Sequence, residues 1–254
     1  MAEQVLLERH GAVLVISINR PERRNAVTRE VSEGIAAGIN LLDSDAELSV
    51  GILTGVGGSF CSGMDLKAFV DGQRPEIDGR GLGGITETPP NKPLIAAVEG
   101  FAVAGGCELA LACDLIVAAE NARFGLPEVT RGLVAGSGGL VRLPQKIPRA
   151  IALEYALTGD QFDAPTAHHW GLVNQLTPQG GALKAALALA LRISANAPLA
   201  VAMSKRIITE SETWEVSEQW SKQTPLVDSI IASADAHEGS LAFTEKRAPE
   251  WQGK

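Results

Sequence analysis

Apolar residues in the first part of the chain follow strand-like and helix-like patterns in turn. Two apolar runs, residues 4–9 and 12–19, flank a tight turn and predict a β-hairpin. Thr28 is a good N-cap, and apolar residues recur at helical spacing from 31 to 42 on one face. The short β-branched run at 48–55 then predicts a buried strand. This alternation is typical of an α/β protein.

Glycine and proline are frequent in the segment that follows. Residues 71–90 are rich in turn formers, and we expect a mobile loop there. The next apolar strand turns through Ala104-Gly105-Gly106 into a short helix, and a further apolar strand runs from about 114 to 119. A glycine turn between a strand and a helix start leaves backbone N–H groups free for a ligand.

Helices are predicted to dominate from residue 145 onward. Three of the four tryptophans, at 214, 220 and 251, lie in the last 55 residues. Such large apolar side chains either pack within the subunit or form an oligomer surface, and the sequence leaves both open. We divide the chain before Pro198, into a core of residues 1–197 and a helical C-terminal region of residues 198–254.

The overall composition excludes several classes of protein. Hydrophobic residues make up 45% of the 254 residues and charged residues 20%, values typical of a soluble globular protein. The formal net charge of −8 has the wrong sign for binding the phosphates of a nucleic acid. No apolar stretch reaches the ~18 residues that a membrane span needs. We expect no nucleic acid and no membrane among the partners.

The cysteine pattern favours a reducing compartment. The three cysteines, Cys61, Cys107 and Cys113, are odd in number and form no C-x-x-C pair, which indicates neither a disulfide framework nor a zinc site. The N-terminal residues lack the apolar run and cleavage site of a signal peptide, and they do not form an Arg/Ser-rich transit sequence. We expect a cytoplasmic protein.

Common catalytic and cofactor signatures are missing from the sequence. It has no phosphate-binding P-loop pattern, and its glycine-rich segments do not fit the dinucleotide-binding pattern. Ser137 lies in AGSGG, which is one glycine short of a nucleophile elbow. None of the four histidines is placed by a motif as a base, and no H-E-x-x-H motif is present. We expect no metal site.

Two glutamates stand out because they lie against apolar and glycine-rich sequence. Glu108 falls in the first helical turn after Gly105, and Glu128 follows a proline close to Arg131. Each has a structural alternative. Glu108 would pair favourably with the dipole at a helix N-terminus, and Glu128 would be a surface charge on a loop or would pair with the arginine. Together, two buried carboxylates divide acid and base work when their environments separate their pKa values. The N–H groups beside Met64 and Gly105 would then form an oxyanion hole.

Five long motifs occur along the chain, and together they span most of it. They are NRPERRNAV at 19–27, GSFCSGMDL at 58–66, PLIAAVEGFAVAGGCELALACD at 93–114, FGLPEVTRGLVAGSGGLVRLP at 124–144 and the tail LAFTEKRAPEWQGK. These motifs resemble the crotonase superfamily, the enoyl-CoA hydratases and isomerases. The resemblance implies an α/β fold with a spiral core of repeated ββα units. It also implies a helical C-terminal region that builds a homotrimer or a dimer of trimers.

The resemblance assigns roles to the candidate residues. Met64 and Gly105 match the positions whose N–H groups hold the thioester oxygen. Glu108 matches the residue that deprotonates the attacking water, and Glu128 the residue that delivers a proton to the α-carbon. Gly136 matches a glycine whose N–H helps to hold the water. The implied activity is reversible hydration of a 2-enoyl-CoA, with an acyl-CoA as the substrate and no cofactor beyond its coenzyme A.

Several activities within the superfamily stay open. Possession of both glutamates favours hydration over double-bond migration, since isomerases of the superfamily commonly keep only the second. The segment 125–148 and the ending EKRAPEWQGK also resemble the carnitinyl-CoA dehydratase branch. Ala135 stands where hydratases often have proline, which leaves the shape of the acyl pocket open. A non-enzymatic scaffold of the same fold is a further alternative, although it would be expected to lose a glutamate.

A coenzyme A site must reverse the negative net charge locally, because the coenzyme carries phosphates. In the superfamily, a Phe and a Lys of the tail reach the coenzyme of a neighbouring subunit. The alternative is that the basic residues are solvated surface charges. The predicted coenzyme A residues are Arg23, Arg24, Ser62, Asp65, Leu66, Lys67, Phe243 and Lys246, and the predicted boundaries of the acyl pocket are 71–90, Val134 and Ala135.

Overall fold

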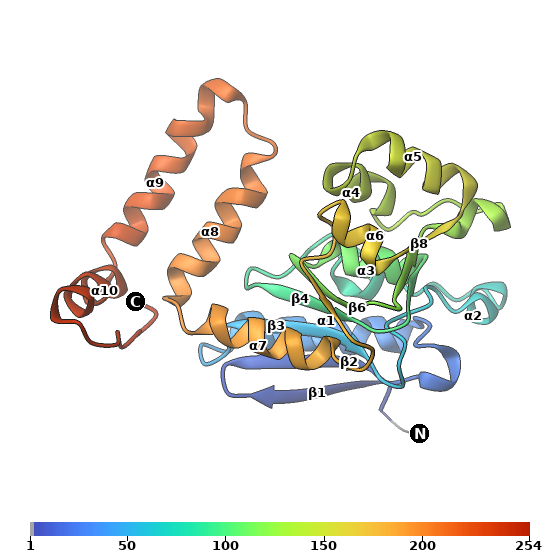
Figure 1. The fold of residues 1–254 in the computed structure, drawn as a ribbon, viewed down its shortest axis with the longest axis horizontal. Helices are drawn as coiled ribbons and strands as arrows, with labels where there is room; N and C mark the ends of the chain where they lie inside the picture. Colours follow the sequence, from blue (N-terminus) through green and yellow to red (C-terminus); the bar gives the residue numbers. More distant parts are fainter. Residues whose placement is uncertain (1–2) are drawn as a thin grey trace.

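The computed structural model describes residues 3–254 and shows an α/β fold built on one large sheet (Figure 1). The sheet has six strands, and their order across it is also their order along the chain. The first two strands are antiparallel, and every later pair of neighbours is parallel. The strands are β1 (Val5–His10), β2 (Val13–Ile18), β3 (Val50–Gly55), β4 (Leu94–Val98), β6 (Leu115–Ala119) and β9 (Gln175–Thr177). The predicted hairpin and the predicted strands at 48–55 and 114–119 are confirmed.

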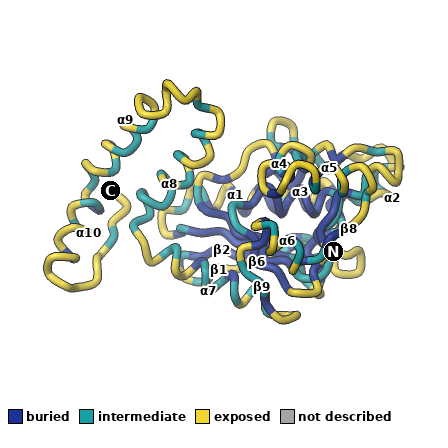
Figure 2. The backbone as a smooth tube through the Cα atoms, turned by 45° about the horizontal axis from the view of Figure 1, so that its top comes forward, coloured by how far each residue is buried: buried dark blue, intermediate teal, exposed yellow. Residues whose placement is uncertain are grey.

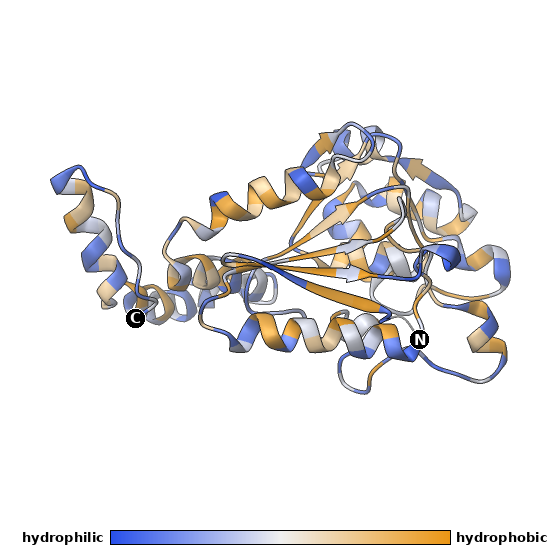
Figure 3. Ribbon diagram, turned by 90° about the horizontal axis from the view of Figure 1, so that it is seen from below, coloured by the Kyte–Doolittle hydropathy of each residue, from blue (hydrophilic) through white to orange (hydrophobic). Residues whose placement is uncertain are grey.

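Helices cover both faces of this sheet. Helix α1 (Arg29–Ser44) begins where the sequence predicts, because Thr28 Oγ1 accepts a hydrogen bond from the Val31 N–H at 3.4 Å. Its apolar face packs on one side of the sheet, and small residues of α7 (Ala182–Ser194) pack on the other. Burial on both faces explains why the parallel strands are nearly continuous apolar runs. Figure 3 shows these strands in orange between helices of mixed hydropathy.

A second sheet of three short strands carries the glycine turn. It consists of β5 (Phe101–Val103), β7 (Arg123–Gly125) and β8 (Gln161–Asp163). Helix α3 (Gly105–Ala112) follows β5, and all of its residues are buried. The predicted turn from strand to short helix is confirmed. The sequence does not predict β8 and β9, because strands of three residues are too short to show a period.

Several short helices connect the strands, and η2 and α4 pack against α3. Two 3-10 turns, η1 and η2, and one short α-helix precede α3 in the chain, and the remaining elements follow β7. They are η1 (Pro21–Arg23), α2 (Leu66–Val70), η2 (Leu82–Gly84), η3 (Pro127–Arg131), α4 (Gly139–Lys146), α5 (Arg149–Thr158) and α6 (Ala164–His169).

The segment 71–90 differs from the predicted mobile loop. Residues 71–74 are exposed, but residues 81–86 are buried, and η2 packs against α1 and α3. Gly83 has a φ of +62°, and a Cβ there would lie 2.6 Å from Leu109 Cδ2. A glycine permits both the left-handed backbone and this close approach. The prediction is therefore wrong for residues 81–86, because their glycines allow tight packing rather than motion.

The C-terminal region forms helices that extend away from the core (Figure 1). They are α8 (Pro198–Ser211), η4 (Val216–Glu218), α9 (Gln219–Ile231) and α10 (Ala234–Glu245). No residue of α8 or α9 is buried, and Figure 2 shows this part in teal and yellow. The predicted division before Pro198 coincides with the start of α8, and the oligomeric role of the region stays a prediction.

Helix α8 leaves the core at a sharp bend. It follows α7 at an angle of 107°, and Lys205 Nζ ties it back to the core at 2.7 Å from Asp114 Oδ2. The same ammonium donates to the Lys92 carbonyl oxygen at 3.0 Å. No single helix among residues 3–254 is long and apolar enough to cross a membrane, and α7 and α8 reach that length and composition only when taken together.

Candidate active site

The turn between β5 and α3 brings two backbone N–H groups together. Ala104 has a φ of +53°, and its N–H donates to the Gly125 carbonyl oxygen at 2.9 Å, which ties the turn to β7. A Cβ on Gly105 would lie 3.5 Å from the Met64 nitrogen and 2.6 Å from Leu82 Cδ2, so a side chain does not fit there. Within residues 3–254, neither the Met64 N–H nor the Gly105 N–H donates a backbone hydrogen bond to another loop or turn. Two adjacent free donors are what an oxyanion hole requires.

Glu108 lies in the first turn of α3 and is only 3% exposed. Its Oε1 accepts hydrogen bonds from the Ser137 N–H at 2.7 Å and from the Gly139 N–H at 3.0 Å. Burial raises the pKa of Glu108, while these two donors and the charge of Arg142 oppose the rise. Both hydrogen bonds fall on one oxygen, so Oε2 is left for a water molecule in the cavity that Glu108 lines.

Glu128 lies in η3, and its environment is poorer in donors. Its Oε2 is buried and has no hydrogen-bond partner among the residues that the structure describes. Burial raises the pKa of Glu128 to about 7, and the charge of Glu108 adds to the rise. The predicted alternative, a bridge to Arg131, is not formed, because that guanidinium donates to the Pro127 carbonyl oxygen and to Thr130 Oγ1. A buried carboxyl with a pKa near neutrality is suited to hold and deliver a proton.

The two carboxyl groups therefore lie in different environments. Glu108 accepts two amide hydrogen bonds, which favour its ionised form. Glu128 keeps its proton up to a pKa of about 7. Two carboxyl groups with such different partners, beside a pair of free N–H groups, are suited to serve as base and acid next to an oxyanion hole.

A cavity of about 490 Å³ connects these groups. The predicted site residues on its wall are Arg24, Ser62, Met64, Leu66, Gly105, Glu108, Glu128 and Gly136. From the predicted acyl pocket, Val134 and the segment 71–90 contribute, the latter through Arg74, Glu76 and Leu82. Ala135 does not line the cavity, since it is buried in the hydrophobic core.

The loop after β2 presents Arg24 to this cavity. Asn25 has a φ of +56°, and its buried side-chain amide donates to the carbonyl oxygens of Val56 at 2.9 Å and Ser59 at 2.6 Å. These bonds fix the loop, and the Arg24 guanidinium carbon lies 5.3 Å from the centre of the Phe101 ring. Arg24 is thus a cation held at the cavity wall.

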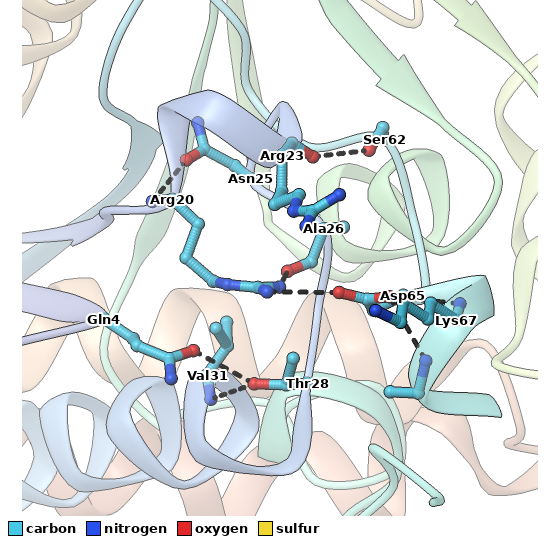
Figure 4. Close-up of polar contacts among 11 residues, drawn as sticks. Gln4, Arg20, Arg23, Asn25, Ala26, Thr28, Val31, Ser62, Asp65 and Lys67 are labelled. Atoms are coloured by element: carbon cyan, nitrogen blue, oxygen red, sulfur yellow. Dashed lines mark hydrogen bonds and ion pairs between the residues drawn. The ribbon is translucent and has the colours of Figure 1, made fainter. Parts of the chain in front are cut away.

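Arg23, Asp65 and Lys67 are not among the residues that line the cavity. Figure 4 shows the polar contacts that they make. Asp65 Oδ2 accepts from Arg20 Nη2 at 3.1 Å, and Oδ1 caps the N-terminus of α2 by accepting from the Lys67 N–H at 3.1 Å. Arg23 contributes its carbonyl oxygen, which accepts from Ser62 Oγ at 3.4 Å. Asp65 therefore holds the loop in place, and the predicted contacts of these three residues with coenzyme A stay untested.

Phe243 and Lys246 lie in and just after α10, on the C-terminal region rather than at the cavity. Phe243 is 86% exposed. Lys246 caps α10 with a φ of +56°, a left-handed conformation that turns the chain away from the helix. Their predicted contact with the coenzyme of a neighbouring subunit stays a prediction.

Sequence reasoning missed the groups that hold Glu108. The Ser137 and Gly139 N–H groups and the Arg142 guanidinium were not predicted, whereas the Gly136 N–H was. The run of glycines at 136–139 was the available signal, because a Cβ on Gly139 would lie 3.0 Å from Glu108 Cγ. Within residues 3–254, no cluster of His, Cys, Asp and Glu side chains could hold a metal ion.

Comparison with known proteins places the chain in a family. The chain matches the enoyl-CoA hydratase/isomerase family over residues 8–254. It belongs to that family. The structure of an enoyl-CoA hydratase from Mycobacterium marinum is 58% identical, covers 100% of both chains and superposes with a TM-score of 0.98. This similarity confirms the predicted crotonase fold.

Other relatives carry a different name. A carnitinyl-CoA dehydratase from Salmonella typhi is 42% identical over 100% of both chains. The structure of a carnitinyl-CoA hydratase from Mycobacterium avium is also 42% identical over 100% of both chains, with a TM-score of 0.81. Both branches that the sequence analysis names therefore occur among the relatives.

Proposed function

We propose that this protein is an enoyl-CoA hydratase, a hydro-lyase that adds water reversibly across the α,β double bond of a 2-enoyl-CoA thioester. The observation that carries the proposal is the pairing of two unlike carboxyl groups. Glu108 accepts hydrogen bonds from two backbone amides through Oε1, whereas Glu128 Oε2 is buried with no hydrogen-bond partner among the described residues, and the Glu128 carboxyl has a pKa of about 7. Family membership supports the same chemistry.

The geometry divides the reaction among these groups. Ionised Glu108 accepts a proton from water through its free Oε2, and the water oxygen bonds to the β-carbon. The Met64 and Gly105 N–H groups stabilise the negative charge that develops on the thioester oxygen. Protonated Glu128 then donates its proton to the α-carbon, and the reverse steps remove water. The Gly136 N–H, on the same cavity wall, is proposed to orient the water.

The substrate supplies its own coenzyme, and we propose that no other cofactor takes part. Arg24 at the cavity wall is a cation for the phosphates of coenzyme A, with Ser62 and Leu66 beside it. We further propose a homotrimer or a dimer of trimers in the cytoplasm, in which Phe243 and Lys246 complete a neighbour's coenzyme site. The exposed side chain of Phe243 supports this part.

An absorbance assay with crotonyl-CoA tests the proposal. Hydration removes the conjugated double bond, so the ultraviolet absorbance of the thioester should fall at a rate proportional to the enzyme concentration. A fall that also occurs with the Glu108→Gln, Glu128→Gln double variant would not come from this site. Absence of turnover across short and long enoyl-CoA esters would favour a non-enzymatic scaffold.

A second candidate is dehydration of a β-hydroxyacyl-CoA that carries a quaternary amine, as the names of the relatives at 42% identity suggest. One cavity residue favours it. Glu76 lines the cavity, and its side chain forms no ion pair among residues 3–254 with which to neutralise its charge. A carboxylate there would attract a cationic acyl group. Glu76→Gln should then reduce turnover of a quaternary-amine CoA ester and spare crotonyl-CoA, whereas an equal change on both esters would contradict this reading.

A further inference from the structure

The loop that holds Glu108 has little regular structure of its own. Residues 133–138 form no helix or strand, and Gly138 has a φ of +96°. The Ser137 N–H of this loop lies 2.7 Å from Glu108 Oε1, and the N–H of Gly139, the first residue of α4, lies 3.0 Å from the same oxygen. A glycine-rich loop keeps such a geometry only when another group holds it, because glycine restricts the backbone least.

The guanidinium of Arg142, on α4, holds it from the side, in addition to the backbone hydrogen bonds from the Val141 and Arg142 N–H groups to the Gly138 carbonyl oxygen. Nη1 of Arg142 donates to the Ser137 carbonyl oxygen at 3.5 Å, and Nη2 donates to the Thr86 carbonyl oxygen. A Cβ on Gly138 would lie 2.1 Å from Nη1, so the guanidinium rests directly against the loop backbone. Thr86 is itself anchored in the core, since its Oγ1 accepts from the Leu82 N–H at 2.9 Å. One guanidinium thus links the loop to the buried segment under the cavity.

The charge of Arg142 also acts on Glu108. It lowers the pKa of Glu108, whereas the charge of Glu76 on the segment before η2 raises it. Glu128, on η3, is the other carboxyl close enough to interact with Glu108. The neighbouring Cys107 thiol is neutral at pH 7, because burial raises its pKa to about 12. Arg142 is therefore the cation that favours the ionised carboxylate among these neighbours.

We propose that Arg142 is a positioning residue for hydration, which fixes the turn that holds Glu108 and supplies the positive charge beside that carboxylate. The inference rests on the proposed role of Glu108 as the base. It adds a requirement that the two carboxylates alone do not impose. The base acts only while the guanidinium bridges the loop and the core.

The test compares R142M and R142K with the wild-type enzyme, and R149M serves as the control. Arg149 is an exposed arginine at the start of the next helix. R142M should lower kcat by about 10- to 100-fold with a nearly unchanged KM, because a misplaced base costs rate rather than binding. The acidic limb of its pH profile should move to higher pH by about one unit, because ionised Glu108 has lost its cation. R149M should change neither quantity.

R142K separates position from charge. An ammonium keeps the charge but lacks the planar fork that bridges two carbonyl oxygens, so the acidic limb should stay near its wild-type pH while kcat stays low. If R142M is slow but keeps the wild-type acidic limb, the residue is merely structural and the proposal is wrong. If R142M does not fold, R142K decides, and a wild-type kcat in R142K overturns the proposal. Failure of the proposed function would be seen separately, as normal turnover in Glu108→Gln.

Discussion

Residues 3–197 and residues 198–254 keep their shape by different means. In the first part, the strands of the large sheet are buried on both faces by α1 and α7. In the second part, only Asp235 and Ala242 are buried. Ion pairs and hydrogen bonds hold that part in place of a buried core. Lys205 pairs with Asp114, and Glu238 pairs with Arg247. Asp235 accepts hydrogen bonds from the Gln252 and Gly253 N–H groups.

The difference indicates which part of the molecule has the surface for a partner. The C-terminal helices expose large apolar side chains, among them Trp220 at 75% and Ile231 at 69%. Exposed apolar groups that gather on one region mark an interaction surface. The core, by contrast, encloses its own cavity and every candidate catalytic group. We therefore expect chemistry and assembly to be separable by mutation.

The largest expected effect is the loss of catalytic activity on substitution of a core carboxyl group, with assembly unchanged. Glu108→Gln and Glu128→Gln should each lower kcat by about 100- to 10,000-fold, because each removes one step of general acid or base catalysis. The molar mass by light scattering and the affinity for a CoA ester should stay at wild-type values. Near wild-type turnover in either variant would refute the division of labour between the two carboxyl groups.

A smaller effect, on the binding of CoA esters, is expected from a substitution in the C-terminal region. Lys246→Ala should raise KM for CoA esters by about two- to fivefold, since an exposed charge contributes little. The increase should be larger at low salt, where screening is weaker, and kcat should hardly change. Lys222→Ala, an exposed lysine on α9, is the control. Equal changes in the two variants, or a fully active monomer, would contradict a shared coenzyme site.

The smallest effect is on stability, and it has opposite signs in the two regions. Burial raises the pKa of Glu128 to about 7, so folding costs free energy once the unfolded carboxyl ionises near pH 4.5. Hydrogen bonding to Arg247 lowers the pKa of Glu238 to about 2. The ionised Glu238 carboxylate therefore stabilises the fold fully at every pH above the pKa that it has in the unfolded chain. At pH 8, Glu128→Gln should raise Tm by a few degrees and Glu238→Gln should lower it.

Thermal scans at several pH values check these signs. The gain in Glu128→Gln should shrink as the pH falls from 7 and vanish below pH 4.5, because the wild-type carboxyl is then protonated in both states. The loss in Glu238→Gln should persist at pH 5, since its wild-type carboxyl is still ionised there. If Glu128→Gln were less stable than wild type at pH 8, the raised pKa of Glu128 would not destabilise the folded core, and this prediction would be wrong.

The elements that the sequence predicts are those with a long pattern. Thr28 and the apolar positions after it define α1, and the β-branched run at 48–55 defines β3. The three-residue strand β9 has no period to detect, although it completes the large sheet. The stretch 81–86 was predicted to be mobile and is instead buried, because glycine permits both loose turns and close packing.

The candidate site was partly predictable for a similar reason. Glu108 and Glu128 are visible because a carboxylate is unusual among apolar residues. The Ser137 and Gly139 amides are invisible in a sequence, because nearly every residue has an N–H and only the loop conformation selects which one binds. The missing bridge between Glu128 and Arg131 also depends on side-chain direction, which spacing does not fix.

The order of strands in the large sheet has a consequence for how the chain folds as it is made. Because the spatial order is the chain order, each strand of the large sheet can add to the free edge of the strand synthesised before it. No strand must insert between two that are already joined. The edge strand of the incomplete sheet exposes unpaired backbone N–H and C=O groups, which promote aggregation until the next strand pairs with them. Synthesis of β9, only three residues long, ends that growth with an edge too short to recruit another chain.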